Sequence, residues 1–311
     1  MKTSNHLLRR LTAALLAAVL ALSIALPVFA SDDGDTIYIN SVSDLLSLAR
    51  NCAYDQWSVG KTVILQKDLS LEGMLWEPIP SFSGQFKGNG HTISDLTITG
   101  QYSPAGLFGI VEEQGSIESL SVRGVVSVSD SADTTTGGIV GINHGTLINC
   151  QFTGVVTGDS EVGGIVGRNE SEGTIAHSTA RAIVTGKSST GGIAGYNLGA
   201  ITGCTNVGSI NTEYPEASLD TDGFTAKMVD YINNKMAAAA DDATNSVTNV
   251  ATDTGGIAGR SSGMILTSVN TGTIGYEHVG YNVGGIVGRT DGLVSGCVNQ
   301  GCVLGRKDVG G

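Results

Sequence analysis

The stretch that decides the fold lies at 137–158 and reads GGIVGINHGTLINCQFTGVVTG. Related stretches follow at 162–186, 191–211, 255–275 and 284–305, and each contains the same Gly-Gly-Ile motif. Units of about 24 to 30 residues that return in this way predict a stacked architecture, in which every unit packs on its neighbours.

Three columns of side chains emerge when the units are aligned. The segments 91–100 and 115–124 align without gaps to 145–154, so the repeats begin before the first Gly-Gly pair. The first column holds Ile93, Ile117, Leu147, Ile175, Ile201, Ile265 and Val294. The second holds Leu96, Leu120, Cys150, Ser178, Cys204, Ser268 and Cys297. The third holds Ile98, Val122, Phe152, Ala180, Asn206, Asn270 and Asn299.

These units predict an all-β fold, a parallel β-helix (β-solenoid) of about seven coils. Each unit has short apolar or β-branched strands between Gly-rich turns, is too short for a propeller blade and lacks helical periodicity. The Leu-x-x-Leu-x-Leu signature of leucine-rich repeats is only faint, in the first two coils. The first column should form the core, because burial stabilises by about 25 cal/mol per Å² of apolar surface. An Asp in place of Ile201 should therefore break one layer.

Glycine and asparagine recur at the expected corners. The paired glycines before Ile, and the glycine two residues after it, fit positions that need a positive φ or a close backbone approach. Asn143, Asn169 and Asn197 recur beside these corners, and we expect a role in turns because Asn tolerates the left-handed region. The third column predicts a hydrogen-bonded ladder of Asn270 and Asn299, which Asn206 joins only if the stack is continuous across the interruption that follows it.

The first 30 residues predict a secretory signal peptide, with a basic start, an apolar run at 11–26 and a small-residue cleavage site at 28–30. A retained membrane anchor is the alternative, but the run is short for a span and Pro27 interrupts it. No later stretch is apolar enough to cross a bilayer, so we expect no membrane span in the mature chain.

Residues 31–83 are expected to form a small α/β cap over the first strand edges of the stack. Short strands are predicted at 36–39 and 62–65, with a helix between them that starts at the capping box of Ser41. The two tryptophans of this part are expected to anchor its core, and an aromatic carbohydrate platform is the alternative; they are Trp57 and Trp76.

Repeats are expected at 84–212 and 254–311, with a helical insertion at 213–253. Apolar residues at helical spacing predict a helix over 222–242. It is expected to cover one face, and a partner-binding role is the alternative. The chain ends at Gly311, where the next Gly-Gly pair would begin, so we expect a fragment or truncated reading frame and leave room for a further C-terminal domain.

The charge of the chain argues against a nucleic-acid partner. The formal net charge is −12, and loss of Lys2, Arg9 and Arg10 with the signal peptide brings it to −15. Such an acidic protein repels a phosphate backbone, whereas it suits the solvated surface of an exported protein.

The cysteines predict neither disulfides nor zinc. Three of them share one repeat position and lie about two coils apart or more, beyond the reach of a disulfide when coils rise about 4.8 Å. We therefore expect small buried apolar residues at Cys150, Cys204 and Cys297. With Cys52 and Cys302 included, the chain has no Cys-x-x-Cys or Cys/His spacing typical of zinc.

No catalytic, cofactor-binding or metal-binding residue is assigned, and no cofactor is expected. Glu170 and Glu172 fall in one loop and Asp159 and Glu161 in another, where solvated charges are expected. A Ca²⁺-binding nonapeptide roll would need an Asp that the GGIVG units lack. There is no His-Glu-x-x-His motif, because the histidines are scattered at His91, His144, His177 and His278. A phosphate-cradling loop is also absent.

The recurring GGIVG-x-N-x-G-x-I/L, with Cys or Ser three residues on, resembles the GLUG-motif repeats of exported bacterial proteins. The lead-in WEPIPSFSGQFKGNGHTISDLTI with AGLFG is similar to the segment that opens such arrays. Departures are the insertion, and Ser261 and Thr290 in place of Asn. The resemblance covers about 76–311 and implies adhesin-type surface proteins or the non-catalytic part of some immunoglobulin-A-cleaving peptidases.

The sequence thus predicts a secreted or cell-surface protein that acts as a structural or adhesive scaffold without catalysis. Its expected partners are glycans or proteins of a host or cell surface. The alternative is a carbohydrate-active β-helix enzyme, a polysaccharide lyase or hydrolase, which would need clustered carboxylates in one groove.

Overall fold

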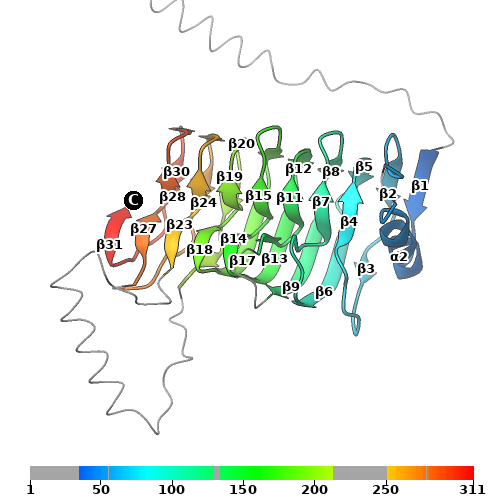
Figure 1. The fold of residues 1–311 in the computed structure, drawn as a ribbon, viewed down its shortest axis with the longest axis horizontal. Helices are drawn as coiled ribbons and strands as arrows, with labels where there is room; N and C mark the ends of the chain where they lie inside the picture. Colours follow the sequence, from blue (N-terminus) through cyan, green and yellow to red (C-terminus); the bar gives the residue numbers. More distant parts are fainter. Residues whose placement is uncertain (1–34, 55, 129–133, 213–250, 278) are drawn as a thin grey trace, which may run out of the picture. The chain divides into compact units, whose positions relative to one another are not determined.

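The structure is a computed structural model that describes residues 35–54, 56–128, 134–212, 251–277 and 279–311. Its compact unit of Thr36–Gly311 is an all-β parallel β-solenoid, as the repeats predict (Figure 1). Each strand pairs in parallel with its counterparts in the coils before and after it, which produces four sheets, named A to D below. A coil in the middle of the stack contributes strands to sheets C, A, B and D in that order.

Sheets A and B have nine strands each. Sheet A consists of β1 (Thr36–Ile39), β2 (Thr62–Leu65), β5 (Gln85–Lys87), β8 (Ser116–Glu118), β12 (Thr146–Ile148), β16 (Thr174–Ala176), β20 (Ala200–Thr202), β25 (Met264–Leu266) and β29 (Leu293–Ser295). Sheet B consists of β3 (Leu69–Ser70), β6 (Thr92–Gly100), β9 (Ser121–Val128), β13 (Gln151–Thr157), β17 (Thr179–Thr185), β21 (Thr205–Asn206), β26 (Val269–Asn270) and β30 (Val298–Asn299), with β22 (Ser209–Ile210) beside β17.

Sheets C and D are shorter, with seven and six strands. Sheet C consists of β4 (Ile79–Phe82), β7 (Phe108–Val111), β11 (Val140–Asn143), β15 (Val166–Asn169), β19 (Ala194–Asn197), β24 (Ala258–Ser261) and β28 (Val287–Thr290). Sheet D consists of β10 (Thr136–Gly137), β14 (Ser160–Gly163), β18 (Ser188–Gly191), β23 (Thr252–Gly255), β27 (Tyr281–Gly284) and β31 (Lys307–Gly310). Sheet A has more rungs than the expected seven coils, because the N-terminal strands β1 and β2 stack on the repeats.

The apolar column of sheet A lies in the core, as predicted. Its fully buried members follow one another in register: Ile117, Leu147, Ile175, Ile201 and Ile265. Val294 continues the column and is partly buried. Towards the N-terminus, however, the next member is Phe86.

The predicted placement of Ile93, Leu96 and Ile98 was wrong. All three lie in β6 of sheet B, where Ile93 opposes Val122. The corner between β5 and β6 spans 88–91, two residues more than the corner between β8 and β9. Those additional residues shift every later side chain of the unit, so an alignment without gaps puts them in the wrong columns. From the second unit onward the third column pairs as expected.

The paired glycines serve close backbone approach rather than a positive φ. None of the glycines in the Gly-Gly-Ile motifs has φ in the left-handed region. A Cβ on Gly164 would come 2.2 Å from the carbonyl oxygen of Gly192 in the next coil. Left-handed residues line another corner, between sheets A and B, and most of them are not glycine: Ser119, Asn149, His177, Gly203, Thr267 and Gly296.

A buried asparagine ladder runs along sheet B. Asn206 Nδ2 donates to Asn270 Oδ1, and Asn270 Nδ2 donates to Asn299 Oδ1, both at 2.8 Å. The predicted ladder is confirmed, and Asn206 belongs to it. Each side chain is therefore paired inside a core where an unpaired amide would be costly.

A second ladder, which the sequence did not predict, follows sheet C. Asn143 Nδ2 donates to Asn169 Oδ1 at 2.7 Å, and Asn169 Nδ2 donates to Asn197 Oδ1 at 2.8 Å. The expected turn role is also present, because Asn143 Oδ1 accepts from the Gly145 N–H at 3.2 Å and Nδ2 donates to the Gly145 carbonyl at 3.1 Å.

The N-terminal part matches its predicted elements. Helix α2 (Val42–Asn51) begins after Ser41, whose hydroxyl accepts from the Asp44 N–H at 3.2 Å. Trp76 is buried and its Nε1 donates to the Leu107 carbonyl at 3.2 Å, which confirms it as a core anchor. Trp57 is partly buried against the same core.

The stack is continuous across the interruption of the repeats. Ile201 opposes Ile265 in sheet A, and Ser188 opposes Thr252 in sheet D. Asn211 Nδ2 donates to Thr254 Oγ1 at 3.0 Å, which links the two flanks. The predicted helix over 222–242 and the predicted signal peptide lie outside the described residues.

Candidate functional site

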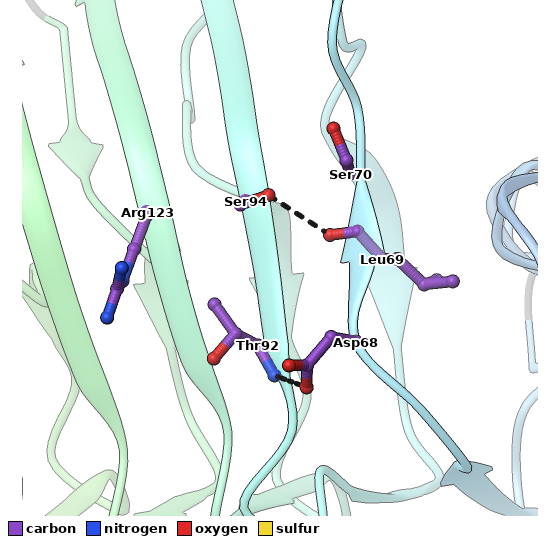
Figure 2. Close-up of a pocket in the computed structure, with 6 residues that line it drawn as sticks. All are labelled: Asp68, Leu69, Ser70, Thr92, Ser94 and Arg123. Carbon is purple, nitrogen blue, oxygen red and sulfur yellow. Dashed lines mark hydrogen bonds between the residues drawn. The ribbon is translucent and has the colours of Figure 1, made fainter.

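A shallow polar hollow lies on the outer side of sheet B, close to the N-terminal end of the stack (Figure 2). Its volume is about 360 Å³, and it is lined by Asp68, Leu69, Ser70, Thr92, Ser94 and Arg123. Figure 2 shows these side chains on three neighbouring rungs, with Asp68 and Arg123 on either side of the strand that carries Thr92 and Ser94. This volume is at the low end of the range of about 300–1,000 Å³ for small-molecule sites.

A β-bulge shapes the hollow. The pairing of β6 with β9 is regular up to Ile93 opposite Val122 and resumes at Leu96 opposite Gly124. Ser94 and Asp95 therefore face a single residue, Arg123, on the next strand. Asp95 has a φ of 60°, in the left-handed region. Bulges re-aim side chains and interrupt flat sheets, which accounts for a hollow on this face.

Both carboxylates of the hollow are held in the ionised form. The backbone N–H of Thr92 donates to Asp68 Oδ1 at 2.9 Å and His91 Nδ1 lies 3.2 Å from the same oxygen, and these contacts lower the pKa of Asp68. The hydroxyls of Ser70 and Ser94 donate to Asp95 Oδ2 at 2.6 and 2.8 Å and lower the pKa of Asp95. A carboxylate with a lowered pKa accepts hydrogen bonds but is a poor general acid.

The carboxylates singled out from the sequence lie elsewhere. Arg168 joins two of them, with Nη1 2.8 Å from Glu161 Oε1 and Nε 2.6 Å from Glu170 Oε1. Asp159 pairs with Lys187 at 2.7 Å. Glu172 accepts from the Ser171 hydroxyl at 2.7 Å, a bond that lowers the pKa of Glu172.

Arg168 starts a column of long side chains on the outer side of sheet C. Arg168, Tyr196, Arg260 and Arg289 are neighbours in register on β15, β19, β24 and β28. The guanidinium carbons of Arg168 and Arg260 each lie 5.2 Å from the centroid of the Tyr196 ring. Both faces of that ring are therefore covered by cations.

Histidine and cysteine side chains do not gather into a site. Within the part of the chain that the structure describes, no three His, Cys, Asp or Glu side chains are placed to hold a metal ion. His278 lies outside that part. All five cysteines are free thiols. Burial raises the pKa of Cys150 and of Cys204 to about 12, which fits the predicted role of small apolar residues, whereas Cys297 is only partly buried.

Sequence reasoning missed both surfaces, for different reasons. The hollow depends on the bulge at Ser94 and Asp95, which no periodicity reveals. The column on sheet C had a readable signal, because Arg168, Tyr196 and Arg260 each directly follow the third glycine of a Gly-Gly-Ile motif. Residues at one repeat position stack in a solenoid, so they form a continuous outer column.

No protein-family model matches the chain. Halomucin of Haloquadratum walsbyi is 31% identical over 155 residues, which cover 46% of this chain and 2% of halomucin. A provisionally named Gly-rich membrane protein of Evansella cellulosilytica is 29% identical over 137 residues, 32% of this chain and 16% of that protein. The chain thus matches only a small part of either relative.

A solved structure provisionally named an immunoglobulin A1 protease, from Bacteroides ovatus, has a similar fold. The two superpose with a TM-score of 0.52 over 85% of this chain and 77% of that one, at 17% sequence identity. At this identity the likeness concerns the fold alone. In the described residues, no helix has the length and apolar character needed to span a membrane.

Proposed function

We propose that this chain is an exported GLUG-type repeat protein that serves as a structural or adhesive scaffold at a bacterial cell surface, without catalysis in these residues. The observation that carries the proposal is the continuous stack, in which two asparagine ladders fix one coil on the next while the outer columns remain free to present side chains. Rigid, regularly spaced faces suit a scaffold.

The relatives and the charge support a place at the cell surface. One relative is named a membrane protein, and the matched segments make up small parts of both relatives, as expected of a repeat module in longer proteins. A basic start and an apolar run at 11–26 support export, and the net charge of −12 supports a solvated surface.

The hollow at the bulge supports binding better than catalysis. Asp68 and Asp95 are ionised and already accept hydrogen bonds, so neither offers the raised pKa of a glycosidic general acid. The remaining oxygens, with Ser70, Thr92 and Arg123, present acceptors and donors suited to the hydroxyls of a neutral glycan. No aromatic side chain lines the hollow, so each contact should be weak and depend on multivalency.

Glycan and protein arrays with the purified chain test the adhesive role. An Asp68→Ala variant should lose retained neutral glycans, whereas Arg181→Ala, which changes an exposed side chain further along sheet B, should keep them. Retention of neither glycans nor host proteins by the wild type would refute adhesion. Turnover of any polysaccharide in a parallel screen would refute the absence of catalysis, and labelling only inside intact producing cells would refute export.

A further inference from the structure

The outer column of sheet C has an uneven charge balance. At its first cation, Arg168, two carboxylates lie within 2.8 Å. Among the described residues, neither Arg260 nor Arg289 forms an ion pair with a carboxylate, although the two stand directly opposite each other on adjacent strands. Like charges in that relationship repel each other across strands about 4.8 Å apart.

One carboxylate lies close to both arginines. Asp291 accepts from the Ser262 hydroxyl, and this bond, followed by the charges of Arg260 and Arg289, lowers the pKa of Asp291. Ser262 Oγ also lies 3.3 Å from Tyr196 Oη. Since Ser262 donates to Asp291, the tyrosine hydroxyl donates to Ser262. A single carboxylate, engaged in this way, leaves the pair of guanidinium groups with excess positive charge.

The stacking on Tyr196 prepares Arg260 for a ligand. Its guanidinium carbon lies 5.2 Å from the ring centroid, a contact that restricts its rotation. A guanidinium stacked by its face keeps its N–H donors in its own plane, and those donors match the two oxygens of a carboxylate or sulfate. Arg289 is exposed beside it, so an anion can reach both groups from solvent.

We propose that Arg260 and Arg289 form a binding site for the carboxylate or sulfate groups of an acidic polysaccharide. The site is separate from the hollow on sheet B, so it stands or falls independently of the neutral-glycan binding proposed there. The pair lies on an open face rather than in a cavity, where a single small anion would bind weakly. A polymer with regularly spaced anions gains from a second contact at high effective concentration.

The test compares retention of three polysaccharides by the full-length chain at low ionic strength: heparin for sulfate groups, polygalacturonate for carboxylates, and dextran as the neutral control. The wild type should retain at least one acidic polymer and release it as salt is added, because exposed charges are screened. Arg289→Gln should weaken that binding at least fivefold. Arg181→Gln, the same charge change on sheet B, should weaken it less than twofold.

Arg260→Lys provides a geometric readout, because it keeps the charge and removes the planar pair of donors. It should also weaken binding, with a melting temperature equal to that of the wild type. Equal losses in Arg181→Gln and Arg289→Gln would overturn the site and indicate diffuse electrostatics. Equal retention of dextran, or retention of polyglutamate as tight as that of the acidic polysaccharides, would overturn the assigned ligand class.

Discussion

Gly192 of sheet D faces Asn206 of sheet B across the interior: a Cβ on Gly192 would lie 2.4 Å from Asn206 Cγ. The same relationship joins Gly256 with Asn270 at 2.5 Å. The second glycine of the repeated pair is thus the space that the asparagine ladder occupies, so the two sequence features depend on each other.

Gly192→Ala should destabilise the protein by about 1–3 kcal/mol, the usual cost of overpacking. The new methyl group would lie 2.2 Å from the Gly256 carbonyl oxygen as well as against Asn206, and neither neighbour can move without disturbing its coil. Urea unfolding followed by circular dichroism measures the loss. Gly310→Ala is the matched control, because no atom lies within 4 Å of its Cβ position. Equal midpoints for the two variants would contradict this account.

Asn169→Asp should cost about 3–5 kcal/mol at neutral pH, because it places an unpaired charge in the core. The new carboxylate would face Asn197 Oδ1, which now accepts a hydrogen bond at 2.8 Å. Burial raises the pKa of such a group above about 3.9, its value in the unfolded chain. The penalty is therefore complete above the folded-state pKa and shrinks as the pH falls through it.

Unfolding of Asn169→Asp and wild type at pH 7 and pH 4 measures that change. Asn149→Asp, at an exposed corner position with a φ of 54°, is the control and should differ little from wild type at either pH. A penalty at position 169 that stays constant or grows on acidification would count against the ladder as the cause.

Asp95→Asn should lower the melting temperature at neutral pH and have no effect in strong acid. Hydrogen bonds from Ser70 and then Ser94 lower the pKa of Asp95, so their stabilisation is present above the unfolded-state value of about 3.9. It is lost as the pH falls through the lower folded-state value. Melting curves from pH 7 to pH 2 follow the difference, and a difference that is independent of pH would refute this role of the serine hydroxyls.

Thiol labelling of the native protein should modify Cys302 first. Cys302 is exposed, whereas Cys52, Cys150 and Cys204 are buried. Burial raises the pKa of Cys52 to about 11 and those of the other two to about 12, so almost no thiolate is present at neutral pH. Mass spectrometry of maleimide adducts before and after unfolding in urea counts the labels. Rapid native labelling of Cys204 would show that the coils open.

The columns from Ile117 onward were predictable because the repeat period alone places like residues on one face. Ile93 was not, since the corner before it has two additional residues and corner length leaves no periodic mark. The ladder of Asn143 and Asn169 was missed for another reason. An asparagine that shapes a turn and one that bonds to the next coil look the same in a single sequence, and here one side chain does both.

The polar surfaces were less accessible to sequence reasoning. Glu161 and Glu170 were assigned to separate loops with solvated charges, but Arg168 reaches both, because sheets C and D meet along the stack. The hollow beside Arg123 depends on a bulge, which is a local exception to the repeat. Exceptions of this kind become visible only once the register of every coil is known.

The hydrogen bond between Asn211 and Thr254 fastens the stack on either side of the place where the chain departs from its period. All the pairings across that seam are made by residues outside 213–250, so the coils keep their phase without help from the residues between. The seam is consequently a permissive splice point: foreign peptides grafted there would be displayed from one flank of a rod whose own architecture they need not disturb.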